Sequence, residues 1–422
     1  MKRESADQLD TKVAKAGRRV RSPTAKFLRR KEAILNAAAV VMNEQGLRGL
    51  TKARVARHFG IVQSGVTYYF STKEALAEAC FMRAIEVYDG MIADALQEIT
   101  VEARLARLIG NAFAFRKQVA TGQTSEITGF DDLRALGDEK IMTAYEDMFR
   151  HARRLFLVNS GKPGSDRSAL NARVHLLLQQ LFWVPVWLRR YDPDDYEGVA
   201  ERTIDIFLNG LGAGARSWSP HRLILEDEVS PQDGGLPETF LQVATRLINL
   251  QGYQGASIDK IAAQLDVTKG AFYYHIDAKD DLVEACFNRT VAVIRRTQKA
   301  AERMPGDGFA RLVATLASLV DHQLDGGSPL LRGAMASLPE ASRDNILMEY
   351  ERCSVRFGTM IGDGIADGSL RPVDTQIAAQ VVTAAINGSA ELAEWTPRSQ
   401  GTAATEFFIR PLFDGLATGL PA

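Results

Sequence analysis

Apolar residues recur at the spacing of an α-helix along most of the chain, and we find no segment with the strict alternation typical of a strand. Near the start, Ile34, Leu35, Ala38 and Met42 predict a helix that ends at Gly46, because a left-handed glycine commonly follows the last turn of a helix. The same spacing continues through residues 105–115, 144–158, 174–188 and 196–211, and again through 309–324, 346–361, 377–392 and 403–416. The pattern therefore predicts an all-α fold with two similar runs of helices.

One segment of the chain occurs twice. Residues 43–81 match residues 249–287 with a constant shift of 206 and no gap. Identical pairs include Gly46/Gly252, Ala56/Ala262, Tyr68/Tyr274, Lys73/Lys279, Leu76/Leu282 and Cys80/Cys286. The ends of the two halves also correspond, since Tyr191-Asp192-Pro193 parallels Trp395-Thr396-Pro397. This repeat is too long for a solenoid unit, so we interpret it as the duplication of a whole domain-sized unit.

Each copy has the layout of a helix-turn-helix. Thr51 and Ser257 are predicted N-caps of a short helix, and Gly60 makes the turn that follows it in the first copy. Asp266 stands at the equivalent turn of the second copy, where an aspartate also tolerates a left-handed backbone. The segments that follow, 62–70 and 268–276, combine small and polar residues, as a helix that enters the major groove of DNA requires.

The residues Tyr68-Tyr69-Phe70, with Lys73 and Leu76 after them, resemble the DNA-binding motif of the TetR family of bacterial regulators. The second copy, with Lys269-Gly270, Tyr273-Tyr274-His275, Lys279 and Leu282, resembles it too. The resemblance implies two TetR-like units, each a helix-turn-helix domain followed by an all-helical ligand-binding and dimerisation domain. We accordingly expect a basic disordered arm at 1–24, DNA-binding domains at 25–80 and 236–286, effector domains at 81–216 and 287–422, and a linker at 217–235.

The same resemblance implies which side chains meet DNA. In the first copy they are Thr51, Arg54, Gln63, Ser64, Thr67, Tyr68, Tyr69 and Lys73; in the second they are Ser257, Lys260, Thr268, Lys269, Tyr273, Tyr274, His275 and Lys279. The side chains that would face base edges are Gln63, Ser64 and Thr67 in the first copy and Thr268, Lys269 and Tyr273 in the second. At least one ring of each aromatic pair, the caps and the two lysines that open the fourth helix would meet phosphate. An alternative for each aromatic pair is that one ring packs in the small core of its domain.

Charge distinguishes the two copies. Residues 25–76 hold nine cations and three anions, whereas the equivalent residues 231–282 hold four cations and seven anions. The balance is therefore +6 against −3 within a chain whose formal net charge is −1. Because phosphate neutralisation supplies most non-specific affinity, we expect the first motif to hold DNA more tightly. The basic arm that leads into the first motif is likewise expected to contact phosphate, and a solvated tail that serves only solubility is the alternative for it.

The effector domains show no catalytic or metal-binding pattern, so we expect neither an enzyme nor a cofactor. The resemblance implies instead a pocket for a small apolar or amphipathic effector, with Phe113, Phe149, Phe182, Trp183, Trp187, Phe357 and Trp395 as candidate lining residues. Ordinary core packing is the alternative for each of them. Cys80, Cys286 and Cys353 are expected to be free thiols. Because the sequence has no long apolar run and no secretory signal, we expect a cytoplasmic protein with no membrane-spanning helix.

We therefore predict a ligand-responsive transcriptional regulator, a repressor in its simplest form, that binds double-stranded operator DNA with two motifs of one chain. Residues 174–190, 196–211, 377–395 and 403–416 match the dimerising helices of the family and would join the halves as an internal pseudo-dimer. Further homodimerisation stays open. One rival hypothesis is a regulator whose first motif alone binds DNA, with the second half as a sensing or partner module. Another is a helical ligand-binding protein without a DNA function.

Overall fold

The computed structural model describes residues 24–157, 167–214, 216–223, 237–268, 270, 278–324, 335, 338–392 and 404–419. Within these ranges there is no β-strand, only one isolated antiparallel bridge between Gly212 and Leu370. The predicted all-α fold is therefore confirmed. In the same ranges, no helix is long and apolar enough to cross a membrane. The predicted basic arm, except Thr24, lies outside the described residues.

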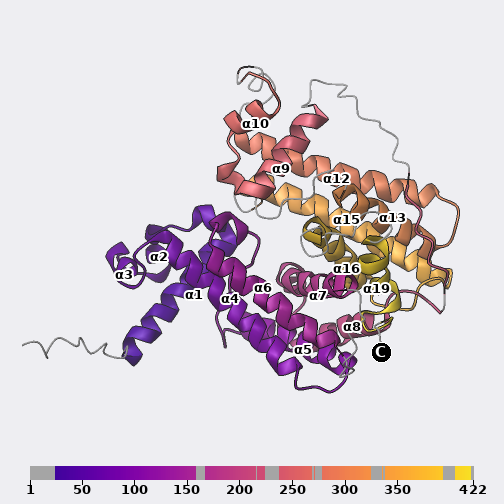
Figure 1. The fold of residues 1–422 in the computed structure, drawn as a ribbon, viewed down its shortest axis with the longest axis horizontal. Coiled ribbons are helices and arrows are strands. Elements are labelled where there is room, and N and C mark those ends of the chain that lie inside the picture. The colour runs from indigo at the N-terminus through magenta and orange to yellow at the C-terminus, as the bar shows by residue number, and fades with distance from the viewer. Residues whose placement is uncertain are drawn as a thin grey trace, which may run out of the picture.

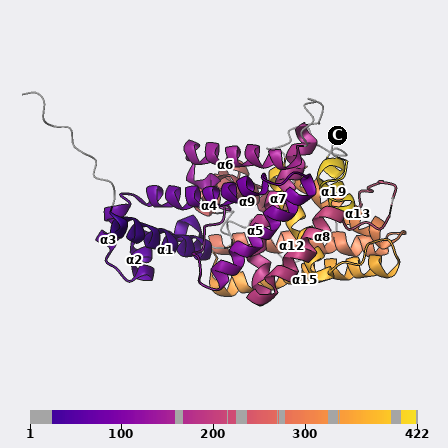
Figure 2. The same cartoon turned by 90° about the horizontal axis from the view of Figure 1, so that it is seen from below.

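The helices of the first half run in the order α1 (Ala25–Gly49), α2 (Lys52–Phe59), α3 (Gln63–Tyr69), α4 (Lys73–Ala95), α5 (Val101–Ala120), α6 (Glu139–Ala152), α7 (Arg167–Trp187) and α8 (Tyr196–Asn209). Those of the second half are α9 (Glu238–Gly255), α10 (Ile258–Gln264), α12 (Lys279–Arg303), α13 (Gly308–Leu324), α15 (Glu340–Ala366), α16 (Thr375–Gly388) and, after the single π-helical turn η6 (Thr405–Ile409), α19 (Arg410–Asp414). In Figure 1, α1, α2 and α3 lie at the left end of the molecule and α9 and α10 lie at the top. The view from below shows α3 again at one end of the long axis (Figure 2).

The duplication is visible in side-chain contacts as well as in sequence. Arg83 of α4 pairs with Glu32 of α1 at 2.8 Å, and Arg289 of α12 pairs through its Nε with Glu238 of α9 at 2.6 Å. The Cys80 thiol donates to the carbonyl of Leu35 at 3.9 Å, and the Cys286 thiol donates to the carbonyl of Leu241 at 3.7 Å. Every residue of the second set stands 206 positions after its counterpart, so the two copies fold around the same internal contacts.

The predicted caps and turns are present in both motifs. Thr51 accepts a hydrogen bond from the amide of Arg54 at 3.1 Å, and Ser257 accepts one from the amide of Lys260 at 3.2 Å. Gly60 has φ 72° and Asp266 has φ 54°, so the prediction that the aspartate adopts the left-handed turn of the glycine is confirmed. The break in α1 at Gly46, where φ is 65°, agrees with the predicted end of the first helix.

The two halves pack against each other through α7 and α8 of the first and α16, η6 and α19 of the second. Their backbones exchange a reciprocal pair of hydrogen bonds, in which the amide of Leu211 donates to Leu412 at 2.9 Å and the amide of Leu416 donates to Phe207 at 2.8 Å. Leu211 and Leu416 hold the same position in their halves, as do Phe207 and Leu412, with a shift of 205. Reciprocal contacts of this kind define an isologous, two-fold interface.

Two glycines allow this close approach. Gly210 has φ 69°, and a Cβ atom there would lie 2.1 Å from the carbonyl oxygen of Phe413. Its counterpart Gly415 has φ 94°, and a Cβ atom there would lie 2.2 Å from the carbonyl oxygen of Leu208. Any side chain would clash with the backbone of the other half, so glycine is required twice at this interface, which we call the seam.

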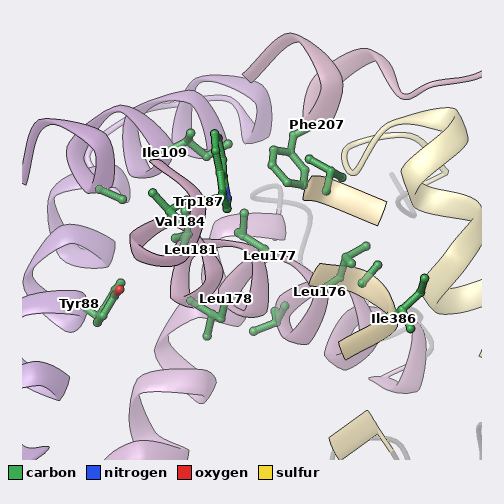
Figure 3. Close-up of a cluster of buried hydrophobic side chains, with 14 of the residues drawn as sticks. Tyr88, Ile109, Leu176, Leu177, Leu178, Leu181, Val184, Trp187, Phe207 and Ile386 are labelled. Carbon is green, nitrogen blue, oxygen red and sulfur yellow. The ribbon is translucent and has the colours of Figure 1, made fainter. Parts of the chain in front are cut away.

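The interior of the seam is mostly apolar, with a few buried polar groups that are hydrogen-bonded. Figure 3 shows Leu176 of α7 and Ile386 of α16 among the buried side chains contributed by the two halves. His175 donates through Nε2 to the carbonyl of Gly388 at 2.6 Å, and the Gln180 amide donates to the carbonyl of Val381 at 2.9 Å. In both bonds a buried donor of the first half is paired with a backbone carbonyl of the second, so the bonds join the halves and satisfy these polar groups.

The first part of the predicted linker is packed on the second half. The Trp218 ring lies 6.4 Å from that of Phe309 and 5.8 Å from that of Phe413, measured between ring centroids. The amide of Leu223 donates to the hydroxyl of Ser318 at 2.9 Å. Trp218 and Leu223 therefore fix this part of the linker to the second half, and residues 224–235 of the predicted linker lie outside the described residues.

Candidate nucleic-acid interface and cavity

Helix α3 presents its polar residues outward. Val66 is fully buried and anchors the helix to the core, so Gln63, Ser64 and Thr67 on the opposite side are exposed. The Thr67 hydroxyl donates to the carbonyl of Gln63 at 3.2 Å within the helix. The three residues predicted to face base edges thus share one accessible face.

The aromatic pair of the first motif divides its roles. Tyr68 is 74% exposed, whereas Tyr69 is half-buried with its ring centroid 4.7 Å from that of Phe27 in α1. Phe70, the next residue, is buried. Tyr69 therefore packs within its domain, in agreement with the alternative that one ring of the pair belongs to the core. Tyr68 is accessible to a phosphate.

Cations surround α3. Arg54 is exposed and donates through one nitrogen to the carbonyl of Gly49 at 3.2 Å, which leaves its other N–H groups available. The ammonium of Lys52 donates to the carbonyl of Ser71 at 2.7 Å and so holds the turn before α4. Lys73 opens α4 half-buried, directly after the N-cap Thr72. Thr51, whose hydroxyl caps α2, is exposed beside them.

The second motif is described in part. Ser257 caps α10, and the ammonium of Lys260 donates to Gln251 at 2.8 Å and to the carbonyl of Gly255 at 2.9 Å. Thr268 is exposed. Four predicted contact residues, Lys269, Tyr273, Tyr274 and His275, lie outside the described residues. Lys260 is therefore held against the end of α9, as Arg54 is held against the end of α1.

Lys279, which opens α12, has a less favourable setting for phosphate than Lys73. Its side chain is half-buried, and burial first and the neighbouring Arg48 second hold its pKa below the usual range. Arg48 belongs to α1, so this part of the second motif faces the end of the first motif. Arg343 at the start of α15 also reaches the first motif and donates to the carbonyl of Glu44 at 3.3 Å.

A cavity of about 930 Å³ lies between the halves. Its wall is formed by the end of α1, the end of α5, the segment 126–132, the end of α7 and the start of α15. Of the predicted pocket residues, Phe182 and Trp183 line it, together with Tyr350 of the second half. Phe149 lines a separate cavity of about 310 Å³ beside α6 and α7.

Three other predicted pocket residues are core residues. Phe113, Trp187 and Phe357 are at most 3% exposed and line neither of these two cavities. Phe113 and Trp187 pack edge to face with a centroid distance of 6.1 Å, so aromatic packing accounts for both. Trp395 lies outside the described residues.

The polar part of the cavity wall was not predicted. Arg116 is only 8% exposed and forms an ion pair with Glu126 at 2.7 Å. Tyr88 and Tyr196, each 6% exposed, line the same cavity, and burial raises the pKa of both hydroxyls. A signal existed in the sequence, because Arg116 continues the apolar stripe of Leu105, Ile109 and Ala112 on α5, where a charged side chain is exceptional.

The cavity wall is hydrogen-bonded to the first DNA-binding motif. The Asn43 side chain donates to the carbonyl of Ile127 at 2.9 Å and accepts from the amide of Gly129 at 3.0 Å. The Leu47 amide donates to the carboxylate of Asp132 at 2.6 Å. Segment 126–132 therefore links the cavity to the end of α1, at the break beside Gly46.

Neither metal-ligand clusters nor reactive thiols accompany these features. Among the described residues no group of three or more His, Cys, Asp or Glu side chains could hold a metal ion. The three cysteines are free and buried, and burial raises the pKa of Cys80 to about 12 and that of Cys286 to about 11. These two thiols are thus protonated at neutral pH.

Comparison with protein families identifies both motifs. The family described as "Bacterial regulatory proteins, tetR family" matches the chain at residues 34–80 and again at 240–286, with the same shift of 206. The Transposon Tn10 TetC protein of Escherichia coli is 25% identical over 142 residues, which cover 33% of this chain and 71% of that protein. The HTH-type transcriptional regulator LmrA of Bacillus subtilis (strain 168) is 34% identical over 89 residues, which cover 20% of this chain and 46% of the regulator.

Solved structures overlap about one half of the chain at a time. Apo AibR superposes with a TM-score of 0.37 and 21% identity, covering 42% of this chain and 98% of the other. The TetR family transcriptional regulator PfmR from Thermus thermophilus superposes with a TM-score of 0.36 and 17% identity, covering 42% of this chain and 98% of the regulator.

Proposed function

The chain is a tandem member of the TetR family of DNA-binding transcriptional regulators, and from this premise we propose that its two halves act as one ligand-responsive unit on a single operator. A helix-turn-helix regulator places two recognition helices in successive major grooves, which ordinarily takes two chains. Here one chain carries both motifs. The proposal places the protein on DNA in the cytoplasm, with an effector domain in each half.

The observation that carries the proposal is the reciprocal pairing at the seam. The bonds from Leu211 to Leu412 and from Leu416 to Phe207 relate the halves as two chains of a homodimer are related. Gly210 and Gly415 repeat the same relation in their close approaches. The seam thus supports an internal pseudo-dimer, in which the spacing of the two motifs is fixed within one molecule.

We expect the two half-sites of the operator to differ in sequence. Gln63 stands where the second motif has Lys269, and Thr67 stands where it has Tyr273. Glutamine pairs bidentately with adenine, whereas lysine favours O6 and N7 of guanine. The half-site under the second motif should therefore be richer in guanine, with each good contact contributing about 1–3 kcal/mol of discrimination.

The cavity supports ligand control of DNA binding. An effector can shift affinity for DNA only if it prefers one arrangement of the motifs over the other. Segment 126–132 forms part of the cavity wall and holds Asn43 and Leu47 at the end of α1. A ligand that displaces this segment would move the first motif against the second and change the spacing that the operator requires.

The experiment that tests the proposal has two parts. Selection of bound sequences from a random duplex library, with the full chain, should recover a site with two unlike half-sites. Light scattering of the complex with that site should show one chain per DNA. Lys269→Gln should make the half-sites more alike, and Gln63→Lys serves as the matched exchange in the first motif. A perfect palindrome that Lys269→Gln leaves unchanged would overturn the proposal.

A second candidate function is a regulator whose first motif alone reads DNA. The charge balance of −3 around the second motif and the cationic neighbour Arg48 of Lys279 favour it. In that case the selected site would contain a single half-site. Removing Ser257 and Lys269 by alanine substitution would then leave affinity unchanged, whereas the same substitutions at Thr51 and Gln63 would reduce it.

A further inference from the structure

The deep end of the cavity between the halves holds more hydrogen-bond donors than acceptors. Arg116 makes one hydrogen bond, to Glu126 at 2.7 Å, and its remaining N–H groups are not sealed inside the protein. Among the described residues, neither Tyr88 nor Tyr196 has a hydrogen-bond partner for its hydroxyl, and both hydroxyls keep accessible surface. Polar side chains this deeply buried ordinarily have a partner, so these donors are available to an acceptor atom that enters the cavity.

The three donors lie on neighbouring helices. Helix α5, which carries Arg116, packs against both α4, which carries Tyr88, and α8, which begins at Tyr196, and all three residues line the same cavity. Tyr88 also packs edge to face on Phe182 with a centroid distance of 5.0 Å, and Phe182 packs on Phe130 at 4.8 Å. The donors therefore stand beside a wall of aromatic rings.

Charge restricts what can occupy this space. Glu126 already neutralises Arg116, so an anionic ligand would bring an uncompensated charge into a buried site. Apart from Arg116 and Glu126, the charged residues of the wall are Glu44, Asp131, Asp132 and Asp344 against Arg189 and Arg343, which further disfavours an anion. An ammonium group carries donors and no acceptor, so it would leave the remaining N–H groups of Arg116 without a partner. The remaining class is uncharged.

We propose that the effector of this regulator is an uncharged aromatic molecule whose carbonyl oxygen accepts hydrogen bonds from Tyr88, Tyr196 and Arg116. This inference rests on the proposed function, because it names the ligand class of the same cavity. The second half closes the wall through Leu347 and Tyr350, so the site is complete only when the halves are packed together. The carbonyl satisfies the donors without adding charge, and the ring system replaces water along Phe130 and Phe182.

Four naphthalenes of nearly equal shape test the proposal by equilibrium dialysis against the full-length protein. They are 2-acetylnaphthalene, 2-ethylnaphthalene, 2-naphthoate and protonated 2-(aminomethyl)naphthalene. The ketone should bind roughly tenfold more tightly than the ethyl compound, since hydrogen bonds to the three donors are gained, and more tightly than either ion. In the double variant Tyr88→Phe/Tyr196→Phe the preference for the ketone should fall to about twofold. Tyr145→Phe is the control, because Tyr145 is equally buried and packs on Phe130 but does not line the cavity.

Equal or tighter binding of either ion would overturn the proposal. So would a preference for the ketone that survives in the double variant, or no binding of any of the four compounds. DNA affinity is measured separately on the selected site. If the ketone binds as expected and DNA affinity does not change, the ligand class stands and ligand control fails. If instead a charged compound binds and weakens DNA binding, ligand control stands and the proposed class fails.

Discussion

The two motifs share their internal contacts: Arg83 and Arg289 each pair with the equivalent glutamate of the first helix, and Cys80 and Cys286 each donate to the equivalent backbone carbonyl. The net charges of the two motifs, in contrast, are +6 and −3 and so differ by nine units. The difference follows from where each residue lies. Losing a buried partner leaves an unpaired polar group and costs about 1–3 kcal/mol. A surface charge usually changes stability by less than about 0.5 kcal/mol. A duplicated fold can therefore keep its interior and still acquire two different binding faces.

The largest expected effect concerns the two glycines of the seam, and it tests whether the two halves contribute equally to this interface. Gly210→Ala and Gly415→Ala each place a methyl group against the backbone of the other half and force a residue with a side chain to adopt positive φ. Together strain and overpacking should lower the free energy of unfolding by roughly 3–5 kcal/mol for either variant. Urea denaturation followed by circular dichroism measures it.

Gly214→Ala is the control for that pair. It also has positive φ, at 68°, but nothing lies within 4 Å of the added carbon. It should show only the cost of backbone strain, about 1–3 kcal/mol. If Gly210→Ala and Gly415→Ala differ from each other by more than either differs from Gly214→Ala, the seam is not the two-fold interface that we describe.

The next effect concerns a buried histidine that only one of the two halves has at this place in the seam. His175 is fully buried on α7, and α16, which occupies the corresponding place, has no histidine. Burial lowers the pKa of His175 to about 4, although its bond to Gly388 opposes the shift. The unfolded chain takes up a proton near pH 6.5 and the folded chain does not, so this stability is present above pH 6.5 and is lost as the pH falls towards 4.

The loss from His175 should reach about 3 kcal/mol at pH 4, since each pKa unit corresponds to about 1.4 kcal/mol. His175→Gln keeps a side-chain N–H donor but cannot titrate, so the difference between the two proteins isolates this residue. Urea titrations at intervals from pH 4 to pH 8 measure it. A difference that does not change with pH would show that His175 has the same pKa in the folded and the unfolded chain.

The sequence was sufficient to predict features that depend on neighbouring residues. The left-handed Asp266 and the caps Thr51 and Ser257 follow from local chemistry, and they occur as predicted. The cavity could not be found in this way, because its wall combines segments from both halves. An aromatic residue such as Phe113 has the same helical spacing whether it lines a pocket or fills the core, and only the distance to the facing helix decides between the two.

A third prediction concerns the difference between the outer faces. Arg54 and Lys260 are equivalent residues with similar contacts to the end of the preceding helix. Arg54→Gln should weaken binding to DNA of any sequence by roughly tenfold, or about 1.4 kcal/mol, at 0.1 M salt, and should reduce the salt slope by about one. Lys260→Gln should change affinity less than threefold, because residues 231–282 carry a net charge of −3.

Fluorescence anisotropy on the selected site and on an unrelated duplex, from 50 to 300 mM salt, measures both variants. The unrelated duplex is the control, since a phosphate contact affects all sequences alike. A larger loss for Lys260→Gln than for Arg54→Gln would contradict the unequal roles that charge gives to the two motifs. Equal losses would mean that the positions of phosphates, and not the surrounding charge, decide the affinity.

The smallest effect concerns the helix start beside Lys73 and Lys279, where each motif has one half of a capping box. Thr72 accepts from the amide of Ala75 at 3.0 Å, whereas at the equivalent residue Ala278 the backbone amide donates to the carboxylate of Asp281 at 2.9 Å. Ala278→Thr should complete the box and stabilise the first turn of α12 by about 1 kcal/mol. Hydrogen exchange of the amides in that turn should then slow by roughly fivefold.

Ala278→Val has the shape of threonine without the hydroxyl and should give no gain, and Thr72→Ala should speed exchange in α4 by a similar factor. Equal protection in the threonine and valine variants would show that side-chain bulk, not the missing acceptor, sets the stability of this turn.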